Sequence, residues 1–245
     1  MNKKSQKEPM SKRQALRLER ARKQRTTRIL TVGGILLVTV VFIGLLVYSS
    51  QQVSAGMIKV TPVDYPQMDG SRVGDPNAKV KIEIFEDFHC SACQAYTQSI
   101  EPTVIKELVI TGKAYYEFHN YPFEDDQSTI KDSDNAAMAV LCAGEQNRFW
   151  DLKNLLYANV QFVWGEFSDE RLESFAEMIN LDMKQFKSCY SEKRYQADID
   201  ASIALGQQYQ VQGTPSVFVN GEYLTPGYVP TFEQIREAVE KALAQ

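Results

Sequence analysis

The chain has 245 residues, of which 44% are hydrophobic and 24% charged, a composition typical of one folded domain with additional segments. Its net charge of −4 is unevenly distributed, because residues 1–28 hold 11 Lys and Arg but only 2 Glu, whereas the remainder holds 16 basic and 29 acidic residues. The acidic remainder would repel phosphate groups, so we exclude nucleic acid from the expected partners.

Residues 29–48 form an uncharged apolar stretch of 20 residues, the length that a helix needs to cross a bilayer. The nearby positive charge lies on its N-terminal side, so we expect residues 1–28 to be a basic cytoplasmic tail and the C-terminal part of this single-pass membrane protein to be exported. A cleavable signal peptide, cut near residues 53–55, is the alternative, but the apolar stretch exceeds the roughly 7–15 residues of a signal core. The basic segment Ser11–Arg28 fits either a helix along anionic headgroups or a solvated topology signal.

The segment that follows the apolar stretch has the composition of a linker. Residues 49–76 contain Gly, Pro, Ser and Asp without sustained periodicity, so we expect a tether with at most one short strand, at residues 57–60. The exported domain is then expected over residues 77–245, and no internal repeat or low-complexity segment is evident in it.

The exported domain begins with the pattern strand, helix, strand. In Lys79–Phe88, apolar and polar residues alternate, which predicts a strand. Cys90–Thr111 predicts a helix that Pro102 interrupts, because proline lacks the N–H that an interior helical position donates. Lys113–Asn120, rich in Tyr and Phe, predicts a second strand. Strand, helix and strand within about 40 residues predict a right-handed βαβ unit with parallel strands.

The remainder of the domain reads as helices, a hairpin and a last helix. Apolar periodicity recurs through residues 127–209, where we expect only helices. Asn220-Gly221 between two short apolar runs predicts a hairpin, and Thr231–Ala244 predicts an amphipathic helix. The order βαβ, helices, ββα predicts an α/β protein with the thioredoxin-like fold, a helical domain inserted in its middle and one transmembrane helix before it.

Two cysteines, Cys90 and Cys93, lie between the first strand and the helix that follows it. At a helix N-terminus the helix dipole and the unpaired N–H groups stabilise a thiolate, so we expect Cys90 to be the exposed nucleophile and Cys93 the resolving thiol one turn inside. Half of a zinc site and two inert thiols are the alternatives. The redox interpretation is favoured, because neither of the two histidines makes a usual zinc-ligand spacing with the remaining cysteines.

The other two cysteines, Cys142 and Cys189, both fall in the helical block. An exported domain permits a structural disulfide between them, which we favour. Buried free thiols that pack as small apolar residues, or a second redox-active pair, are the alternatives.

A proline stands at the start of the third strand, where it cannot donate a hydrogen bond to the sheet. A cis bond between Thr214 and Pro215 would accommodate it and expose the Thr214 backbone, and an ordinary trans proline in a loop is equally compatible with the order of residues.

Several segments match a known family: Phe85–Cys93, Pro102, Thr111–Lys113, Asn120–Phe123, Cys142–Trp150 and Gly213–Gly221. Through them the chain, over about residues 80–242, resembles the DsbA/DsbG-like thiol–disulfide oxidoreductases, in particular their membrane-anchored bacterial branch. The resemblance implies an active-site dithiol at Cys90 and Cys93. It also implies a cis proline at Pro215, with the Thr214 backbone facing the dithiol.

Two positions depart from the family pattern. Ser91 replaces the proline that often follows the first cysteine, and Ile84 stands where many members have a buried Glu. Glu83 and Glu86 are near, but strand alternation points Glu83 to the opposite face from Ile84. The usual proton relay is therefore not expected at that position, and the family's redox potential does not carry over.

The favoured function is a DsbA-like oxidase that introduces disulfides into thiol-containing exported proteins and uses no cofactor. The resemblance implies reoxidation by a quinone-linked membrane partner of the DsbB or vitamin K epoxide reductase-like kind. A disulfide reductase or isomerase of the same fold is one alternative. A thioredoxin-like protein that binds copper or zinc at Cys90 and Cys93 is the other.

Overall fold

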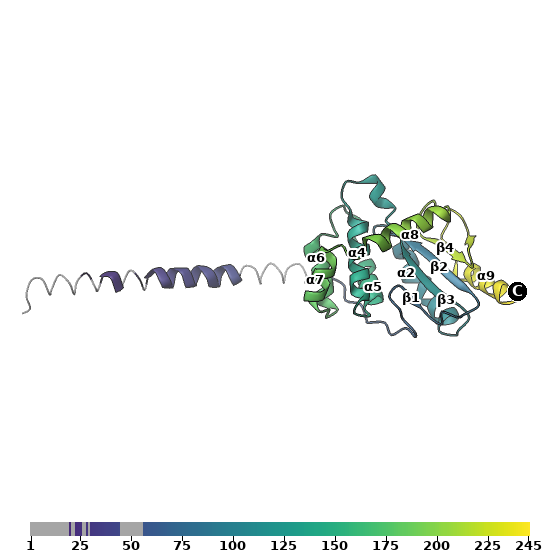
Figure 1. Cartoon of the computed structure of the whole chain (residues 1–245), viewed down its shortest axis with the longest axis horizontal. Coiled ribbons are helices and arrows are strands. Elements are labelled where there is room, and N and C mark those ends of the chain that lie inside the picture. The colour runs from purple at the N-terminus through teal and green to yellow at the C-terminus, as the bar shows by residue number, and fades with distance from the viewer. Residues whose placement is uncertain (1–19, 21–22, 26–27, 29, 45–55) are drawn as a thin grey trace, which may run out of the picture. The chain divides into compact units, whose positions relative to one another are not determined.

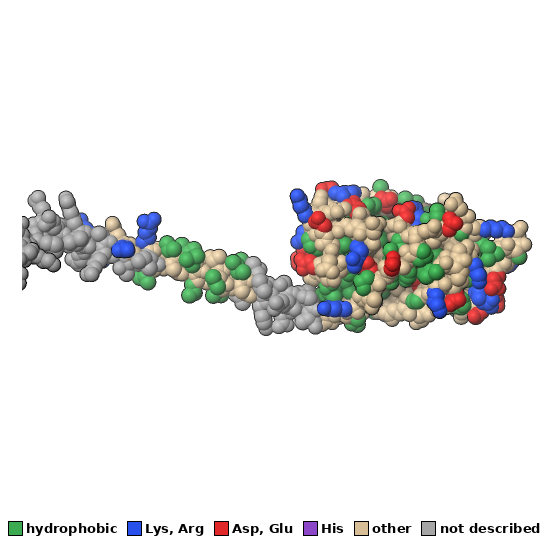
Figure 2. All heavy atoms as spheres, turned by 90° about the horizontal axis from the view of Figure 1, so that it is seen from below, with side chains coloured by type: hydrophobic (Ala, Val, Ile, Leu, Met, Phe, Trp, Pro, Cys, Tyr) green, Lys and Arg blue, Asp and Glu red, His purple; other side chains and the backbone are tan. Residues whose placement is uncertain are grey.

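The computed structural model describes residues 20, 23–25, 28, 30–44 and 56–245, and the chain divides into two units, residues 1–56 and 57–245. In the first unit, one helix of 22 residues, Lys23–Gly44, is long and apolar enough to cross a membrane, with a mean hydropathy of 2.0. Figure 2 shows apolar side chains along its described part. The expected cleavage alternative at residues 53–55 lies outside the described residues.

The second unit, residues 57–245, is built on a mixed five-stranded sheet of order β1-β3-β2-β4-β5 (Figure 1). The central strand β2 pairs in parallel with β3 and antiparallel with β4, while β1 and β5 form the edges. This arrangement confirms the expected thioredoxin-like topology. The strands are β1 Arg72–Val73, β2 Lys81–Glu86, β3 Tyr115–Asn120, β4 Ser216–Val219 and β5 Glu222–Leu224.

The helix between β2 and β3 is interrupted, as expected, but the break lies before the proline. Helix α2 covers Ser91–Ser99, α3 covers Glu101–Val104, and a π-helical turn continues over Ile105–Val109. A single turn residue, Ile100, with a φ of −114°, separates α2 from α3, so Pro102 falls in the first turn of α3. Proline is favourable there, because a first-turn N–H has no partner within its own helix.

Helices α4 to α8 all lie between β3 and β4 in the sequence, which confirms the helical insertion (Figure 1). A disulfide joins Cys142 of α4 to Cys189 of α7, with the Cα atoms 5.8 Å apart. The bounds are α4 Asp132–Gly144, α5 Phe149–Asn159, α6 Asp169–Met178, α7 Met183–Ser191, α8 Gln196–Gln208 and α9 Phe232–Leu243, with a short 3-10 helix over Glu124–Gln127.

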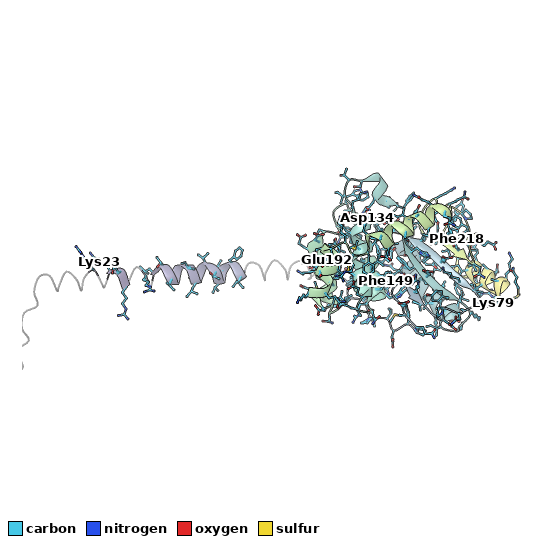
Figure 3. All side chains as sticks on the ribbon, in the orientation of Figure 1. Lys23, Lys79, Asp134, Phe149, Glu192 and Phe218 are labelled. Atoms are coloured by element: carbon cyan, nitrogen blue, oxygen red, sulfur yellow. A yellow bond between two sulfur atoms is a disulfide. The ribbon has the colours of Figure 1, made fainter. Side chains whose placement is uncertain are left out.

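The last helix, α9, closes the domain against the start of the central strand. Thr231 and Gln234 form a capping box at its N-terminus, which satisfies N–H groups that the helix leaves unpaired. At the C-terminal end of α9, the Lys79 side chain donates a hydrogen bond to the carbonyl of Leu243 at 3.0 Å. Figure 3 shows Lys79 beside this helix. The segment just before β2 is therefore joined to the C-terminal end of α9.

Residues 57–76, which we expected in the tether, belong to the second unit. The prediction of a short strand at residues 57–60 is wrong, because this backbone bonds to a side chain and not to a neighbouring strand. The Asn159 Oδ1 accepts a hydrogen bond from the Ile58 N–H at 2.7 Å, and the Asn159 Nδ2 donates one to the Ile58 carbonyl. Further along, the Val63 N–H donates to Asp151. The segment is therefore held by side chains of α5 instead of by a neighbouring strand.

Candidate functional site

The turn between β2 and α2 sets the position of the first cysteine. Cys90 is the N-cap residue of α2, and its N–H donates to the carbonyl of Asp87 at 3.2 Å. The buried Asp87 carboxylate accepts hydrogen bonds from the His89 N–H, the Ser133 hydroxyl and the Glu124 N–H. These three bonds fix the turn, and burial raises the pKa of Asp87 to about 6 despite them.

The two cysteines of the motif differ in accessibility and acidity. Cys90 is 9% exposed and Cys93 is fully buried, so Cys90 is more accessible but less open to solvent than we expected. Hydrogen bonds that a Cys90 thiolate can accept from the Cys93 thiol, the Thr214 hydroxyl and the N–H groups of Cys93 and Ala92 lower the pKa of Cys90 to about 6. Burial raises the pKa of Cys93 well above the ordinary value. Cys90 is therefore the thiol that ionises first.

Thr214 and Pro215, just before β4, lie opposite the Cys90 sulfur. The peptide bond between them is cis, and the Thr214 carbonyl oxygen accepts a hydrogen bond from Cys90 Sγ at 3.3 Å. The Thr214 hydroxyl is buried and has no hydrogen-bond partner among the described residues, so it is available to a Cys90 thiolate. The structure brings together the four residues that we expected in the site, although they come from opposite ends of the domain.

A short hydrogen-bond chain holds the loop that carries Thr214. The Ser216 hydroxyl donates to the Gly213 carbonyl at 2.7 Å and lies 2.6 Å from the Tyr223 hydroxyl. Because the Ser216 hydrogen is already used, Tyr223 is the donor to Ser216. The Tyr223 ring stacks on Phe218 with centroids 4.5 Å apart, so the chain is anchored on β4 and β5.

A buried acid lies beneath the dithiol, at a position that the family pattern did not indicate. Glu86 is 1% exposed, its Oε2 accepts from the Thr97 hydroxyl at 3.2 Å, and its charge contributes to the raised pKa of Cys93. Burial raises the pKa of Glu86 to about 8. Strand alternation was the available signal, because Glu86 lies two residues beyond Ile84 on β2 and so shares its face.

A buried lysine of α5, Lys153, lies near Glu86 and is linked to it through Thr97. Lys153 is fully buried and its ammonium lies 2.7 Å from the Glu101 carboxylate and 3.1 Å from the Thr97 hydroxyl. Tyr116 also donates to Glu101 at 3.0 Å, and the ammonium lies over three aromatic rings. A buried charge is stable when it is paired in this way, and Thr97 links the pair to Glu86.

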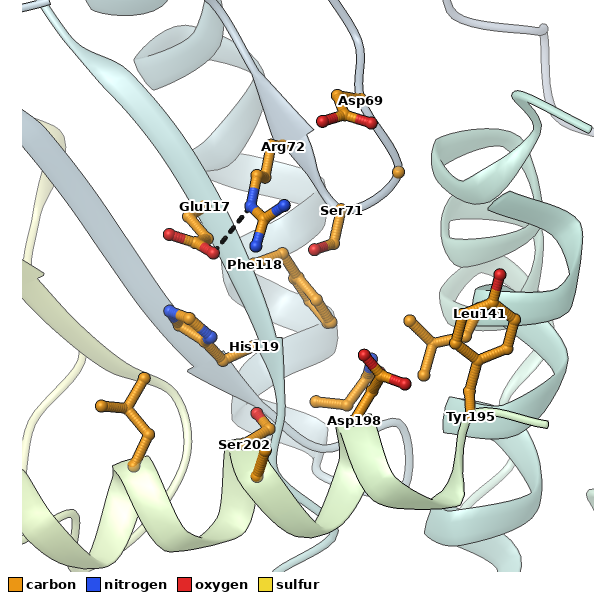
Figure 4. Close-up of a pocket in the computed structure, with 14 residues that line it drawn as sticks. Asp69, Ser71, Arg72, Glu117, Phe118, His119, Leu141, Tyr195, Asp198 and Ser202 are labelled. Atoms are coloured by element: carbon orange, nitrogen blue, oxygen red, sulfur yellow. Dashed lines mark hydrogen bonds and ion pairs between the residues drawn. The ribbon is translucent and has the colours of Figure 1, made fainter. Parts of the chain in front are cut away.

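Among the described residues, the group spaced to hold a metal ion is Glu83, Glu117 and His119, which does not include the cysteines. Its carboxylates are already paired: Lys81 lies 2.6 Å from Glu117 and 2.9 Å from Glu83, and Arg72 lies 2.8 Å from Glu117. Although burial opposes it, hydrogen bonds from His119 and Lys81 lower the pKa of Glu83 to about 2. Figure 4 shows Arg72 and Glu117 in the wall of the adjacent cavity of about 390 Å³. The internal ion pairs balance this cluster without a metal.

Comparison with known proteins gives consistent matches. The model of a thioredoxin family matches residues 67–241. The chain is 30% identical to disulfide bond formation protein D of Bacillus anthracis over 176 residues, 70% of this chain and 77% of the relative. It is 27% identical to a protein-disulfide oxidoreductase of Rickettsia conorii over 200 residues, 80% of this chain and 69% of the relative. The solved structure of oxidised BdbD from Bacillus subtilis covers 77% of this chain and 100% of its own, with a TM-score of 0.64 and 20% identity, a likeness of fold.

Proposed function

Because this chain belongs to the thioredoxin family and is related to disulfide bond formation proteins, we propose that it introduces disulfides into exported proteins through Cys90 and Cys93. It is a thiol–disulfide oxidoreductase, the activity that we expected from its motifs and that the names of its relatives state. The substrates would be thiol-containing proteins exported to the side of the membrane where the domain lies.

The observation that carries the oxidising direction is the pKa of Cys90, lowered to about 6. A stabilised thiolate lowers the free energy of the reduced dithiol relative to the disulfide, so the disulfide is readily transferred to a substrate. A reductase needs the opposite balance, in which the reduced dithiol is the less stable form. The stabilised Cys90 thiolate therefore supports the oxidase, and the reduction potential of the couple decides between it and the reductase or isomerase alternative.

The exchange proceeds in two steps. A substrate thiolate attacks Sγ of Cys90 in the oxidised protein, forms a mixed disulfide and releases Cys93 as the leaving thiolate. A second substrate thiolate then attacks the substrate sulfur of the mixed disulfide, which forms the substrate disulfide and releases Cys90 as a thiolate. Two electrons pass from the substrate to the protein, and the low pKa of Cys90 makes it the better leaving group in the second step.

Glu86 is suited to supply the proton that this exchange requires. Burial raises the pKa of the Cys93 thiol, so Cys93 must take up a proton once it is released as a thiolate. Burial also raises the pKa of Glu86 to about 8, so this carboxyl holds a proton at neutral pH beside Cys93. Thr214 would act on the substrate side, where its backbone, 3.3 Å from the Cys90 sulfur, is placed to pair with the substrate backbone.

The direction can be tested with the full chain in detergent micelles. The oxidised chain is mixed with a reduced, unfolded protein that needs disulfides, and the loss of substrate thiols is followed. We expect transfer of one disulfide per chain from the wild type and none from Cys90→Ser. If the reduced chain instead opens substrate disulfides faster than the oxidised chain forms them, the reductase alternative is correct.

At the membrane, the apolar helix would hold the domain on the outer side, near emerging substrates and near a quinone-linked partner that reoxidises the dithiol. The basic residues 1–28 and the hydropathy of the helix support this orientation. Protease added to intact spheroplasts should digest residues 57–245 and leave an N-terminal tag protected. A soluble, N-terminally trimmed product would instead show a cleaved signal peptide.

A further inference from the structure

A cavity of about 560 Å³, lined by the C-terminal end of α8 and by parts of β4 and β5, contains no charged side chain. Its wall consists of glutamine amides, aromatic rings, Gly221 and Pro226. The cavity of about 620 Å³ in the helical insertion and the one of about 390 Å³ beside β3 are different, because each is lined by both cationic and carboxylate side chains. We call the uncharged one the glutamine cavity.

The end of α8 brings three side-chain amides to the glutamine cavity. Gln208, Gln210 and Gln212 line it, all three are exposed, and none of their amides has a hydrogen-bond partner among the described residues. The chain reverses at this helix end, where the Val211 N–H donates to the Gly206 carbonyl at 2.9 Å, a bond typical of helices that end in a left-handed residue. Gln210 is that residue, with a φ of +56°. The reversal places alternate residues around one cavity.

The aromatic side of the glutamine cavity is fixed before any ligand binds. The Phe218 ring has Tyr223 stacked on it at 4.5 Å and Tyr209 tilted against it at 4.9 Å between centroids. Both tyrosine hydroxyls are held elsewhere, that of Tyr223 by Ser216 at 2.6 Å and that of Tyr209 by Glu83 at 3.3 Å. Rings that are already held lose little conformational entropy when a ligand packs on them.

The aromatic wall belongs to the face of the sheet that is turned away from the thiols. Phe218 lies in one apolar cluster, whereas its neighbours Val217 and Val219 lie in the cluster that contains Cys90 and Cys93. Successive residues of a strand point to opposite faces, which explains this division. The glutamine cavity is therefore a site separate from the exchange at Cys90.

We propose that the glutamine cavity binds a neutral saccharide chain. A sugar ring has an apolar C–H face, which packs on the electron-rich face of an aromatic ring, and hydroxyl groups around its edge. Each hydroxyl needs both donors and acceptors, and a glutamine amide offers both. The lining holds no charge that would favour an ionic ligand. This binding goes beyond the proposed function, because it uses neither thiol.

The test measures saccharide binding by the full chain in nanodiscs of phosphatidylcholine, a lipid without a sugar headgroup. Saturation-transfer NMR is used to titrate three neutral trisaccharides: maltotriose, cellotriose and triacetylchitotriose, of which the last carries acetamido groups. Trigalacturonate is the charged comparison, and a blocked tripeptide of serine represents a polypeptide occupant.

The variants are Gln210→Ala and Gln212→Ala, and the matched control is Gln207→Ala. Gln207 is exposed at the same end of α8 but does not line the glutamine cavity. We expect at least one neutral trisaccharide to bind with a Kd of about 1–10 mM, as a few neutral hydrogen bonds and a ring contact provide. Each of the two variants should raise this Kd about fivefold, the loss of one neutral hydrogen bond, whereas the control should stay within about twofold.

Three results would overturn the proposal. The first is the absence of binding by all three neutral trisaccharides at about 20 mM, a concentration above the expected Kd. The second is binding of trigalacturonate or of the serine peptide as tightly as the best neutral sugar, because the cavity would then not select neutral saccharides. The third is an unchanged Kd in both variants, which would place the sugar elsewhere on the chain.

Disulfide transfer separates this proposal from the proposed function. Gln210→Ala should transfer its disulfide at the rate of the wild type, because its amide lies at a site separate from Cys90. A clear fall in that rate would contradict this separation and overturn the proposal. If sugars fail to bind while the wild type still transfers disulfides, the saccharide site is wrong and the thiol–disulfide exchange stands.

Discussion

The sulfur of Cys90 lies 3.3 Å from the carbonyl oxygen of Thr214, although the two residues are 124 positions apart in the sequence. The sheet makes this contact, because β2 and β4 are neighbours and Phe85 of β2 pairs with Ser216 of β4. Cys90 follows β2 and Thr214 precedes β4 by a few positions, and because the two strands are antiparallel, both residues lie at the same end of this strand pair. The Cys90 thiol and the Thr214 backbone are thus held together by one strand pairing.

The pH dependence of alkylation should distinguish the two thiols of the reduced protein. Because the pKa of Cys90 is lowered to about 6, its thiolate is populated above that pH, and its reaction with iodoacetamide should have a midpoint near pH 6. Cys93 should stay unlabelled until much higher pH, since burial raises its pKa. A midpoint for Cys90 at about 8.5, the value of an ordinary cysteine, would contradict this.

Serine substitutions should separate attack from resolution. Cys90→Ser should abolish exchange with any thiol substrate, because the remaining thiol, Cys93, is fully buried. Cys93→Ser should still form a mixed disulfide through Cys90 when that thiol is supplied as an activated disulfide, but it has no thiol to resolve the intermediate. Mass spectrometry should then find substrates attached to Cys90. Full exchange by Cys90→Ser would reverse the assignment.

Glu86 should make the stability of the reduced protein depend on pH. Its pKa is raised from 4.5 to about 8, so the folded state keeps a proton that the unfolded chain releases, and the unfolding free energy falls as pH rises through that window. Glu86→Gln removes the titrating group, so the variant should lose less stability between pH 5 and pH 8 than the wild type. Urea denaturation at the two pH values measures this.

The matched control for that experiment is Glu107→Gln, since the Glu107 side chain is 48% exposed and lies in the π-helical turn Ile105–Val109. The control should keep the pH dependence of the wild type. If Glu86→Gln also keeps it, Glu86 is ionised in the folded protein and cannot hold the proton that the proposed exchange assigns to it.

The Cys142–Cys189 disulfide should stabilise the domain without taking part in exchange. It closes a separation of 47 residues between α4 and α7, and the chain-entropy model gives about 4 kcal/mol of stabilisation for a loop of this length. Replacing both cysteines by alanine should lower the unfolding free energy by about that amount. The rate of exchange at Cys90 should be unchanged, and a large fall in that rate would show a second redox-active pair.

The regular elements could be predicted because their signals are local. The alternation in β2, the Tyr- and Phe-rich β3 and the Asn220-Gly221 turn each indicate their structure within a few residues, and all three are found. β1 has only two residues, Arg72 and Val73, so it is too short to show the alternation that predicts a strand. Its pairing with β3 depends on tertiary contacts alone.

The site was predictable to the extent that its residues carry family motifs. Cys90, Cys93, Thr214 and Pro215 stand in matched motifs, and the structure brings them together. Glu86 matches no expected position, and its high pKa arises from burial, which only the packed fold produces. The low exposure of Cys90 likewise depends on packing and could not be read from the order of residues.

The reduction potential of the Cys90–Cys93 couple is the most direct test of the oxidase function. The full chain is equilibrated with glutathione buffers of known potential at pH 7, and the fraction of Cys90–Cys93 disulfide is measured after acid quenching. The stabilised Cys90 thiolate predicts a potential less negative than about −200 mV, on the oxidising side of the glutaredoxins. A potential more negative than about −200 mV would contradict the oxidase and favour the reductase.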